Sequence, residues 1–102
     1  MDKFPCVYIL RCIDKSYYVG STIDLPNRLL QHQLGEGANY TKKRLPVELV
    51  YIELYDRIDD AFYREKQLQG WSKKKKQALI DKLPEYLKTF ACCLNATTHT
   101  NK

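Results

Sequence analysis

The chain has 102 residues, and its 17 Lys and Arg against 12 Asp and Glu give a net charge of +5. This length is typical of one compact domain, and the positive charge favours a polyanionic partner such as a nucleic acid. Hydrophobic residues make up 44% of the chain, with only 4 Gly and 4 Pro, which excludes a disordered or low-complexity chain.

The N-terminal third predicts a β-hairpin followed by a helix. Residues 5–12 (PCVYILRC) and 17–22 (YYVGST) are rich in β-branched and aromatic residues, with turn residues between them. The register stays open: a loop over 13–17 would put Tyr8 and Tyr18 on one face, and a loop over 13–16 would separate them. Asp24 can cap a helix that has Pro26 in its first turn and ends at Gly35.

The rest of the chain predicts a loop, one strand and further helices. Residues 35–46 are rich in glycine and then basic, typical of a surface loop, and residues 47–55 have the propensity and length of a central strand. Further helices are expected from Asp59 or Asp60 to Gly70, from a cap at Ser72 to Pro84, and briefly over 85–94. The prediction is a small α+β domain over residues 1–90 with a polar tail over 91–102.

The sequence has no feature of a membrane or secreted protein. Its apolar runs, such as residues 6–10, are far shorter than the roughly 20 residues that span a bilayer, and the start does not resemble a signal peptide. We therefore expect a cytoplasmic protein with no membrane partner. No cysteine pair has C-x-x-C spacing and no histidine follows at zinc-finger spacing, so free thiols are expected at Cys6, Cys12, Cys92 and Cys93.

Glu65 interrupts an apolar face of the second predicted helix. Apolar residues recur around it at helical spacing, at Ile58, Ala61, Phe62 and Leu68. An unpaired buried carboxylate is costly, so Glu65 needs a cation, a hydrogen-bond partner or a wet cleft. An ion pair with a Lys or Arg is one interpretation, and a metal-binding or acid–base role is the other.

Arg28 and His32 are four residues apart and share one side of the first predicted helix. They could form a solvated face or pair with a carboxylate, and they could equally hold a phosphate and move a proton. The hairpin tyrosines allow ordinary packing as well as a functional role. His99, in the polar C-terminal segment, is expected to have no role.

Two basic runs carry much of the positive charge. They could be solvated, but lysines at a helix N-terminus oppose the helix dipole and favour a nearby anion. Phosphate contacts are therefore predicted for Lys42, Lys43, Arg44, Lys73 and Lys74.

In chain order, V-Y-I at 7–9, Y-V-G at 18–20, Arg28, His32 and Glu65 resemble the GIY-YIG nuclease superfamily. The segments Y-V-G-S-T, D-L-x-x-R-L-x-x-H, K-x-x-P-V-x-L-V-Y and R-E-K-x-x-x-G-W-S-K-x-K-K are most similar to its small stand-alone bacterial members. These members are similar to the nuclease domain of structure-specific junction endonucleases. The resemblance covers residues 4–83. Val7 and Val19 stand where the family has Gly and Ile, and neither change removes a functional side chain.

The resemblance implies a three-stranded antiparallel sheet flanked by helices, and an endonuclease that uses Mg²⁺ or Mn²⁺ to hydrolyse DNA in repair or in processing of branched or single-stranded DNA. Tyr8 and Tyr18 match the motif tyrosines, and Glu65 matches the metal-binding glutamate. Tyr8 would take the proton of the attacking water with help from His32, Arg28 would brace the phosphate, and Tyr18 would position it; the two tyrosines could exchange roles.

Two other functions stay open on the sequence. One is a nucleic-acid-binding module of the same fold that has no turnover, or that needs a protein partner. The other is a structural protein in which Glu65 is ion-paired with Arg28 and inaccessible to a metal.

Overall fold

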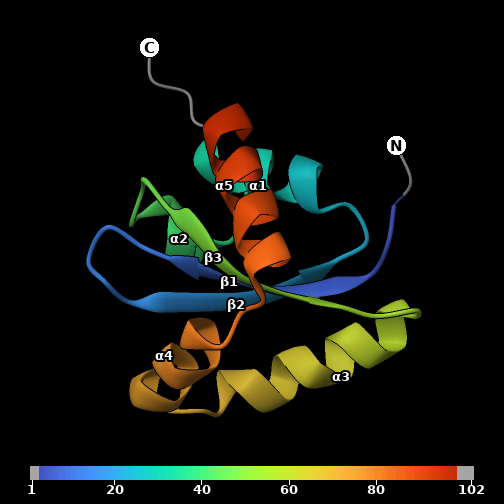
Figure 1. Ribbon diagram of the computed structural model, residues 1–102. Helices are drawn as coiled ribbons and strands as arrows, with labels where there is room; N and C mark the ends of the chain where they lie inside the picture. The colour runs from blue at the N-terminus through green and yellow to red at the C-terminus, as the bar shows by residue number, and fades with distance from the viewer. Residues whose placement is uncertain (1–2, 99–102) are drawn as a thin grey trace.

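The computed structural model describes residues 3–98, which form a three-stranded antiparallel sheet with helices on both faces (Figure 1). The strands are β1 (Cys6–Arg11), β2 (Tyr17–Thr22) and β3 (Glu48–Leu54), in the order β2-β1-β3. The α+β architecture expected from the sequence is confirmed.

The centre of the sheet is β1, whose residues Cys6–Leu10 are all buried. A strand covered on both faces has a continuous apolar sequence rather than an alternating one. The segment 47–55 was expected to be central because of its length, and that expectation is wrong. In the part of the chain that the structure describes, β3 pairs only with β1 and forms an edge, because residues 6–10 are the ones that supply apolar side chains to both faces.

Within residues 3–98, five helices flank the sheet: α1 (Leu25–Gln33), α2 (Asn39–Lys42), α3 (Ile58–Gln69), α4 (Lys73–Asp81) and α5 (Glu85–Thr98). Tyr8 and Leu10 pack with α1 and α5, whereas Val7 and Ile9 pack against α3 and the segment after α4. Asp24 caps α1 and Ser72 caps α4, as predicted. Among residues 3–98, no helix has both the length and the apolar character needed to span a bilayer.

The hairpin register differs from both alternatives that the sequence left open. Tyr8 pairs with Gly20 and Leu10 pairs with Tyr18, and the Cys12 N–H donates to the Ser16 carbonyl at 2.8 Å. The register is shifted by two residues from that of a loop over 13–17. A shift of two preserves the side-chain alternation, so Tyr8 and Tyr18 lie on the same face of the sheet.

An ion pair between α3 and β3 fixes the rotation of α3. The Arg64 Nε and Nη2 donate to the two carboxylate oxygens of Glu53 at 3.0 and 3.1 Å. The hydroxyls of Tyr51 and Tyr55 donate to the same carboxylate at 2.6 and 2.7 Å. Burial alone would raise the pKa of Glu53, but these donors lower it below its usual value. The position of the next residue, Glu65, therefore depends on this ion pair.

The C-terminal helix extends beyond the domain boundary expected at residue 90. α5 continues to Thr98, and Ala91 and Leu94 are buried in the core. The Asn95 side chain accepts from the Leu49 N–H at 2.8 Å and donates to the Leu49 carbonyl at 3.0 Å, beside the irregularity in β3 pairing. Residues 91–98 thus belong to the packed domain. Residues 99–102 of the expected tail, including His99, lie outside the described residues.

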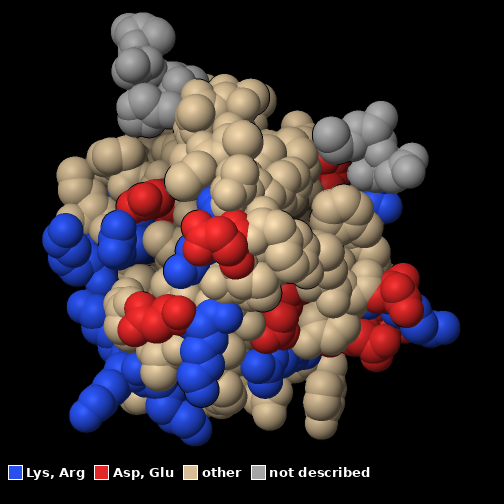
Figure 2. Space-filling view, in the orientation of Figure 1, with Lys and Arg blue, Asp and Glu red and all other residues tan. Residues whose placement is uncertain are grey.

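Many basic side chains gather on one part of the face that Figure 2 shows. Figure 2 shows Lys and Arg concentrated along the left and lower left, over the hairpin loop and α4 of Figure 1. Lys73–Lys76 form the first turn of α4, as the sequence predicted.

The packing of α5 predicts that Leu94→Ala lowers the free energy of unfolding by about 2–4 kcal/mol, because the truncation leaves a cavity against β3. Urea unfolding followed by circular dichroism measures this. Cys92→Ala, on the exposed side of the same helix, is the matched control and should change the stability little. Equal stability of the two variants would contradict the placement of α5 in the core.

Candidate active site

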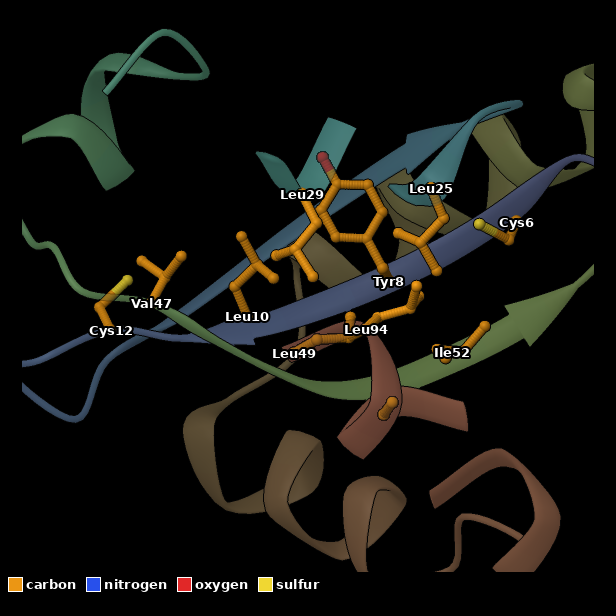
Figure 3. Packing of buried hydrophobic residues seen from close by; sticks show 11 residues of the cluster. Cys6, Tyr8, Leu10, Cys12, Leu25, Leu29, Val47, Leu49, Ile52 and Leu94 are labelled. Atoms are coloured by element: carbon orange, nitrogen blue, oxygen red, sulfur yellow. The ribbon is translucent and has the colours of Figure 1, made fainter. Parts of the chain in front are cut away.

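Tyr8 stands at the centre of the candidate site because a glycine lies opposite it. Figure 3 shows the Tyr8 ring rising from β1 beside Leu25 and Leu29 of α1. Gly20 is its direct partner on β2, and a Cβ atom there would overlap the Tyr8 ring and hydroxyl. The glycine of the Y-V-G motif therefore provides the space in which the Tyr8 ring lies.

His32, on α1, is fully buried and hydrogen-bonded through both ring nitrogens. Its Nε2 lies 2.9 Å from the Tyr8 hydroxyl, and its Nδ1 lies 2.8 Å from the Thr41 hydroxyl. Gly37 closes the loop over the ring, where a Cβ atom would overlap the imidazole. Burial, and then the nearby Arg28 charge, lower the pKa of His32 to about 4, so the ring is neutral at neutral pH.

Thr41 is a site residue that the sequence reasoning missed. Residues 35–46 were expected to be a surface loop, but they contain the short helix α2, and Thr41 is completely buried under His32. The burial depends on a tertiary contact that local composition does not encode. The one signal in the sequence is the pair of glycines, Gly35 and Gly37, shortly after His32, which allow a tight turn back onto α1.

Tyr18 adds a second tyrosine on the same face. Its ring meets His32 edge-on with centroids 5.4 Å apart and stacks on Tyr40 at 6.2 Å. The Arg44 guanidinium lies 3.8 Å from the centre of the Tyr40 ring and binds Asp14 at 3.0 Å. Arg44, predicted to contact phosphate, is thus engaged in holding α2 against the hairpin.

Arg28 acts electrostatically on the hydroxyls of Tyr8 and Tyr18. Burial raises the pKa of both Tyr8 and Tyr18, and the Arg28 charge partly opposes this, whereas Glu65 reinforces it. These effects show that the four side chains are electrostatic neighbours. The Arg28 Nη1 donates to Gln31 at 3.0 Å, and among the ion pairs of residues 3–98 none joins Arg28 to Glu65. The interpretation of Glu65 as a partner of Arg28 therefore finds no support.

Glu65 reaches the site from the opposite face of the sheet. Its Oε1 accepts from the Ser21 hydroxyl, and its Oε2 accepts from Gln69 Nε2 at 2.8 Å. Gln69 also donates to the Val19 carbonyl on the edge of β2 at 3.4 Å. Ser21 and Gln69 are further residues that the sequence reasoning missed, because their role depends on α3 packing against β2.

Glu65 lies at the border of the buried face of α3, not in its middle as expected. Ala61 and Leu68 are fully buried, but Phe62 is 51% exposed and Ile58 is 39% exposed. No Lys or Arg within residues 3–98 forms an ion pair with Glu65. Its charge is solvated by two neutral donors, which leaves it available to a cation.

The site therefore consists of two halves joined at one strand edge. Tyr8, Tyr18 and His32 lie on the α1 face, and Glu65 lies on the α3 face. The two halves meet at β2 because this strand is at the edge of the sheet. Helix α3 can therefore place the Glu65 side chain beside that edge.

Comparison with known proteins identifies a family for this chain. The family model for the GIY-YIG catalytic domain matches residues 4–78. The chain belongs to the GIY-YIG family. The resemblance that the sequence motifs suggested is confirmed, and the five predicted catalytic residues all lie within the matched GIY-YIG segment.

Proteins that are similar to most of this chain are small too. The chain is 41% identical over 81 residues to a UPF0213 protein of Haloquadratum walsbyi, covering 79% of this chain and 91% of the relative. It is 44% identical over 80 residues to a UPF0213 protein of Staphylococcus saprophyticus, covering 78% and 96%. The solution NMR structure of a UPF0213 protein from Bacillus halodurans has a TM-score of 0.52, with 36% identity over 87% of this chain and 94% of that one.

The close approach of Gly20 to Tyr8 predicts that Gly20→Ala lowers the free energy of unfolding by about 1–3 kcal/mol, because the new methyl group displaces the ring. Gly70→Ala is the control, since a Cβ atom there meets the Gln67 carbonyl at an ordinary 3.5 Å. Urea unfolding of both variants measures the difference. If Gly20→Ala is as stable as Gly70→Ala, the ring is not confined by the glycine.

Proposed function

We propose that this GIY-YIG protein is a divalent-metal-dependent endonuclease that hydrolyses phosphodiester bonds of DNA. The observation that carries the proposal is the meeting, at the edge of β2, of a hydrogen-bonded Tyr8–His32 pair with a carboxylate that lacks a cationic partner within residues 3–98. A role in DNA repair or in processing branched or single-stranded DNA, a cytoplasmic location and a targeting protein partner are parts of the same proposal.

Glu65 is the residue that would hold Mg²⁺ or Mn²⁺. Within residues 3–98 no group of three or more His, Cys, Asp or Glu side chains is placed to hold a metal ion. Mg²⁺ needs no such group, because it commonly binds one or two carboxylates together with water and substrate phosphate. The oxygen donors at Glu65 and Ser21 are of the class that Mg²⁺ prefers. A cation there would stabilise charge on the phosphate and lower the pKa of a nearby water.

The tyrosine and histidine would handle the proton of the attacking water. As the water proton moves to the Tyr8 oxygen, the Tyr8 proton moves to His32 Nε2 across their 2.9 Å hydrogen bond. The water oxygen forms a bond to phosphorus, the bond to the leaving oxygen breaks, and solvent protonates that oxygen. Buried His32 is a weak base on its own, and an anionic phosphate nearby favours its protonated form.

Arg28 and Tyr18 would hold the phosphate in this reaction. Arg28 has no carboxylate partner within residues 3–98, so its guanidinium can bind phosphate oxygens in the bidentate geometry typical of Arg. Tyr18 is half-buried with its ring beside His32, and its hydroxyl can orient the phosphate or the water. Such positioning of reacting groups accounts for much of the catalysis of phosphoryl transfer.

The two basic runs lie on opposite faces of one end of β2 and would bind the nucleic-acid backbone there. Lys73 Nζ lies 5.9 Å from the centre of the Tyr17 ring, and Tyr17 donates to Gln77 of α4. On the other face, Tyr18 stacks on Tyr40 of α2, which leads to the exposed Lys42 and Lys43. Lysines at these places can contact phosphates of a nucleic-acid strand on both sides of the point where that strand enters the site.

Glu65→Gln is expected to reduce Mg²⁺-dependent cleavage by roughly a hundred-fold or more, because the neutral amide cannot hold the cation that stabilises the transition state. A panel of flap, branched, single-stranded and duplex DNA, with matched RNA, measures cleavage with and without chelator. Glu85→Gln, at an exposed position in the first turn of α5, is the control with the same chemical change.

Two results would overturn the nuclease proposal. One is the absence of cleavage across the panel with either Mg²⁺ or Mn²⁺. The other is cleavage that is the same in Glu65→Gln and in the native protein. Binding without cleavage would instead favour a nucleic-acid-binding module of the same fold.

Replacing both Lys73 and Lys74 by Ala is expected to flatten the dependence of log Kd on log salt by about 1 for each phosphate that is no longer neutralised. Glu65→Gln should leave this slope unchanged, because Glu65 does not neutralise phosphate. Titration of a labelled DNA at several salt concentrations measures the slope. Lys88→Ala, on the exposed side of α5, is the control, and an equal effect for each lysine removed would assign the slope to net charge alone.

A further inference from the structure

Thr41 determines the direction of a buried hydrogen-bond chain. Its hydroxyl lies 3.0 Å from the Ala38 carbonyl and 2.8 Å from His32 Nδ1. A hydroxyl has one proton to donate, and a carbonyl can only accept. The Thr41 proton therefore goes to Ala38, and the Thr41 oxygen accepts the proton of His32 Nδ1.

This direction continues through the imidazole to Tyr8. A neutral histidine carries a proton on only one ring nitrogen, so protonation of Nδ1 leaves a lone pair on Nε2. Nε2 lies 2.9 Å from the Tyr8 hydroxyl, and that hydroxyl must then be the donor. Because the Tyr8 hydroxyl proton points to His32, the lone pairs of the Tyr8 oxygen remain able to accept a hydrogen bond or a proton from a group in the site.

The hydrogen bond between His32 and Tyr8 could also run in the opposite direction, and its direction decides what Tyr8 can do. If Nε2 carried the proton, it would donate to the Tyr8 oxygen and the Tyr8 hydroxyl would turn outward as a donor. Tyr8 would then bind a phosphate oxygen rather than accept a proton from water. His32 is fully buried, so water does not hydrogen-bond to its ring and stabilise either tautomer. The protein groups that hydrogen-bond to the ring therefore set the tautomer.

We propose that Thr41 is a positioning residue that selects the Nδ1–H tautomer of His32 and so makes Tyr8 a hydrogen-bond acceptor toward the attacking water. The inference rests on the proposed nuclease function for its consequence in catalysis, but the tautomer itself does not depend on that function. Hydrogen-bond partners of this kind fix the orientation and tautomer of functional histidines in many proteins.

Nitrogen NMR of the imidazole reads the tautomer directly, in the protein without substrate or metal. A His99→Gln background leaves only the His32 ring signals. The native protein is expected to show a protonated Nδ1 and an unprotonated Nε2. A predominantly protonated Nε2 would overturn the inference, whether or not the protein cleaves DNA.

Thr41→Val keeps the side-chain shape and removes the acceptor, so the tautomer is expected to shift toward Nε2–H. Thr41→Ser, which keeps the hydroxyl, should restore Nδ1–H. Thr89→Val is the control, because the Thr89 hydroxyl also donates to a backbone carbonyl, that of Glu85, but lies on the exposed side of α5. An unchanged tautomer in folded Thr41→Val would contradict the role of Thr41.

Cleavage assays then test the catalytic consequence. Thr41→Val is expected to lower kcat by about 10-fold or more with little change in KM, since it alters proton handling rather than phosphate binding. Thr41→Ser should recover most of the loss. If the tautomer changes but kcat does not, Tyr8 is not the proton acceptor. If no variant, native protein included, cleaves any substrate, the nuclease proposal fails and the tautomer result stands alone.

Discussion

The buried hydrogen bond between Tyr8 and His32 is the constraint on which the site depends. It joins the central strand to α1 inside the core, where a polar group without a partner would be costly. The other features follow from it. Gly20 makes room for the tyrosine ring, Gly37 makes room for the imidazole, and Thr41 satisfies the remaining ring nitrogen. Four segments separated in sequence are thus arranged around one polar contact.

The edge position of β2 explains how a three-stranded sheet can carry a composite site. A central strand is covered by neighbours on both sides, so side chains from its two faces cannot meet. Side chains from the two faces of the sheet can meet beside β2, because it is an edge strand. Glu65 approaches Ser21 from the α3 face, and Tyr18 lies on the α1 face. The Glu53–Arg64 ion pair connects α3, which carries Glu65, to β3 at the opposite edge of the sheet. The geometry of the site therefore depends on the whole sheet.

Much of this arrangement could be predicted from the sequence. The features that could not be predicted all have the same cause. Strong local signals located the hairpin, the caps at Asp24 and Ser72, and the helices that carry Arg28 and Glu65. The misplaced features depend on tertiary contacts. Thr41 is buried only because α2 folds back onto His32, and β3 is an edge only because β1 is covered on both faces. Similarly, α5 extends past residue 90 because its apolar side meets β3, although polar residues surround that side in sequence.

Both outer strands of the sheet are engaged by a carboxamide side chain. Gln69 donates to the Val19 carbonyl of β2, and Asn95 forms two hydrogen bonds with the backbone of Leu49 in β3. Backbone groups at a sheet edge are a template for strand addition by another molecule, which leads to aggregation. These amides occupy part of that template on each side. A second chain that added a strand at either edge would first have to displace one of these amides.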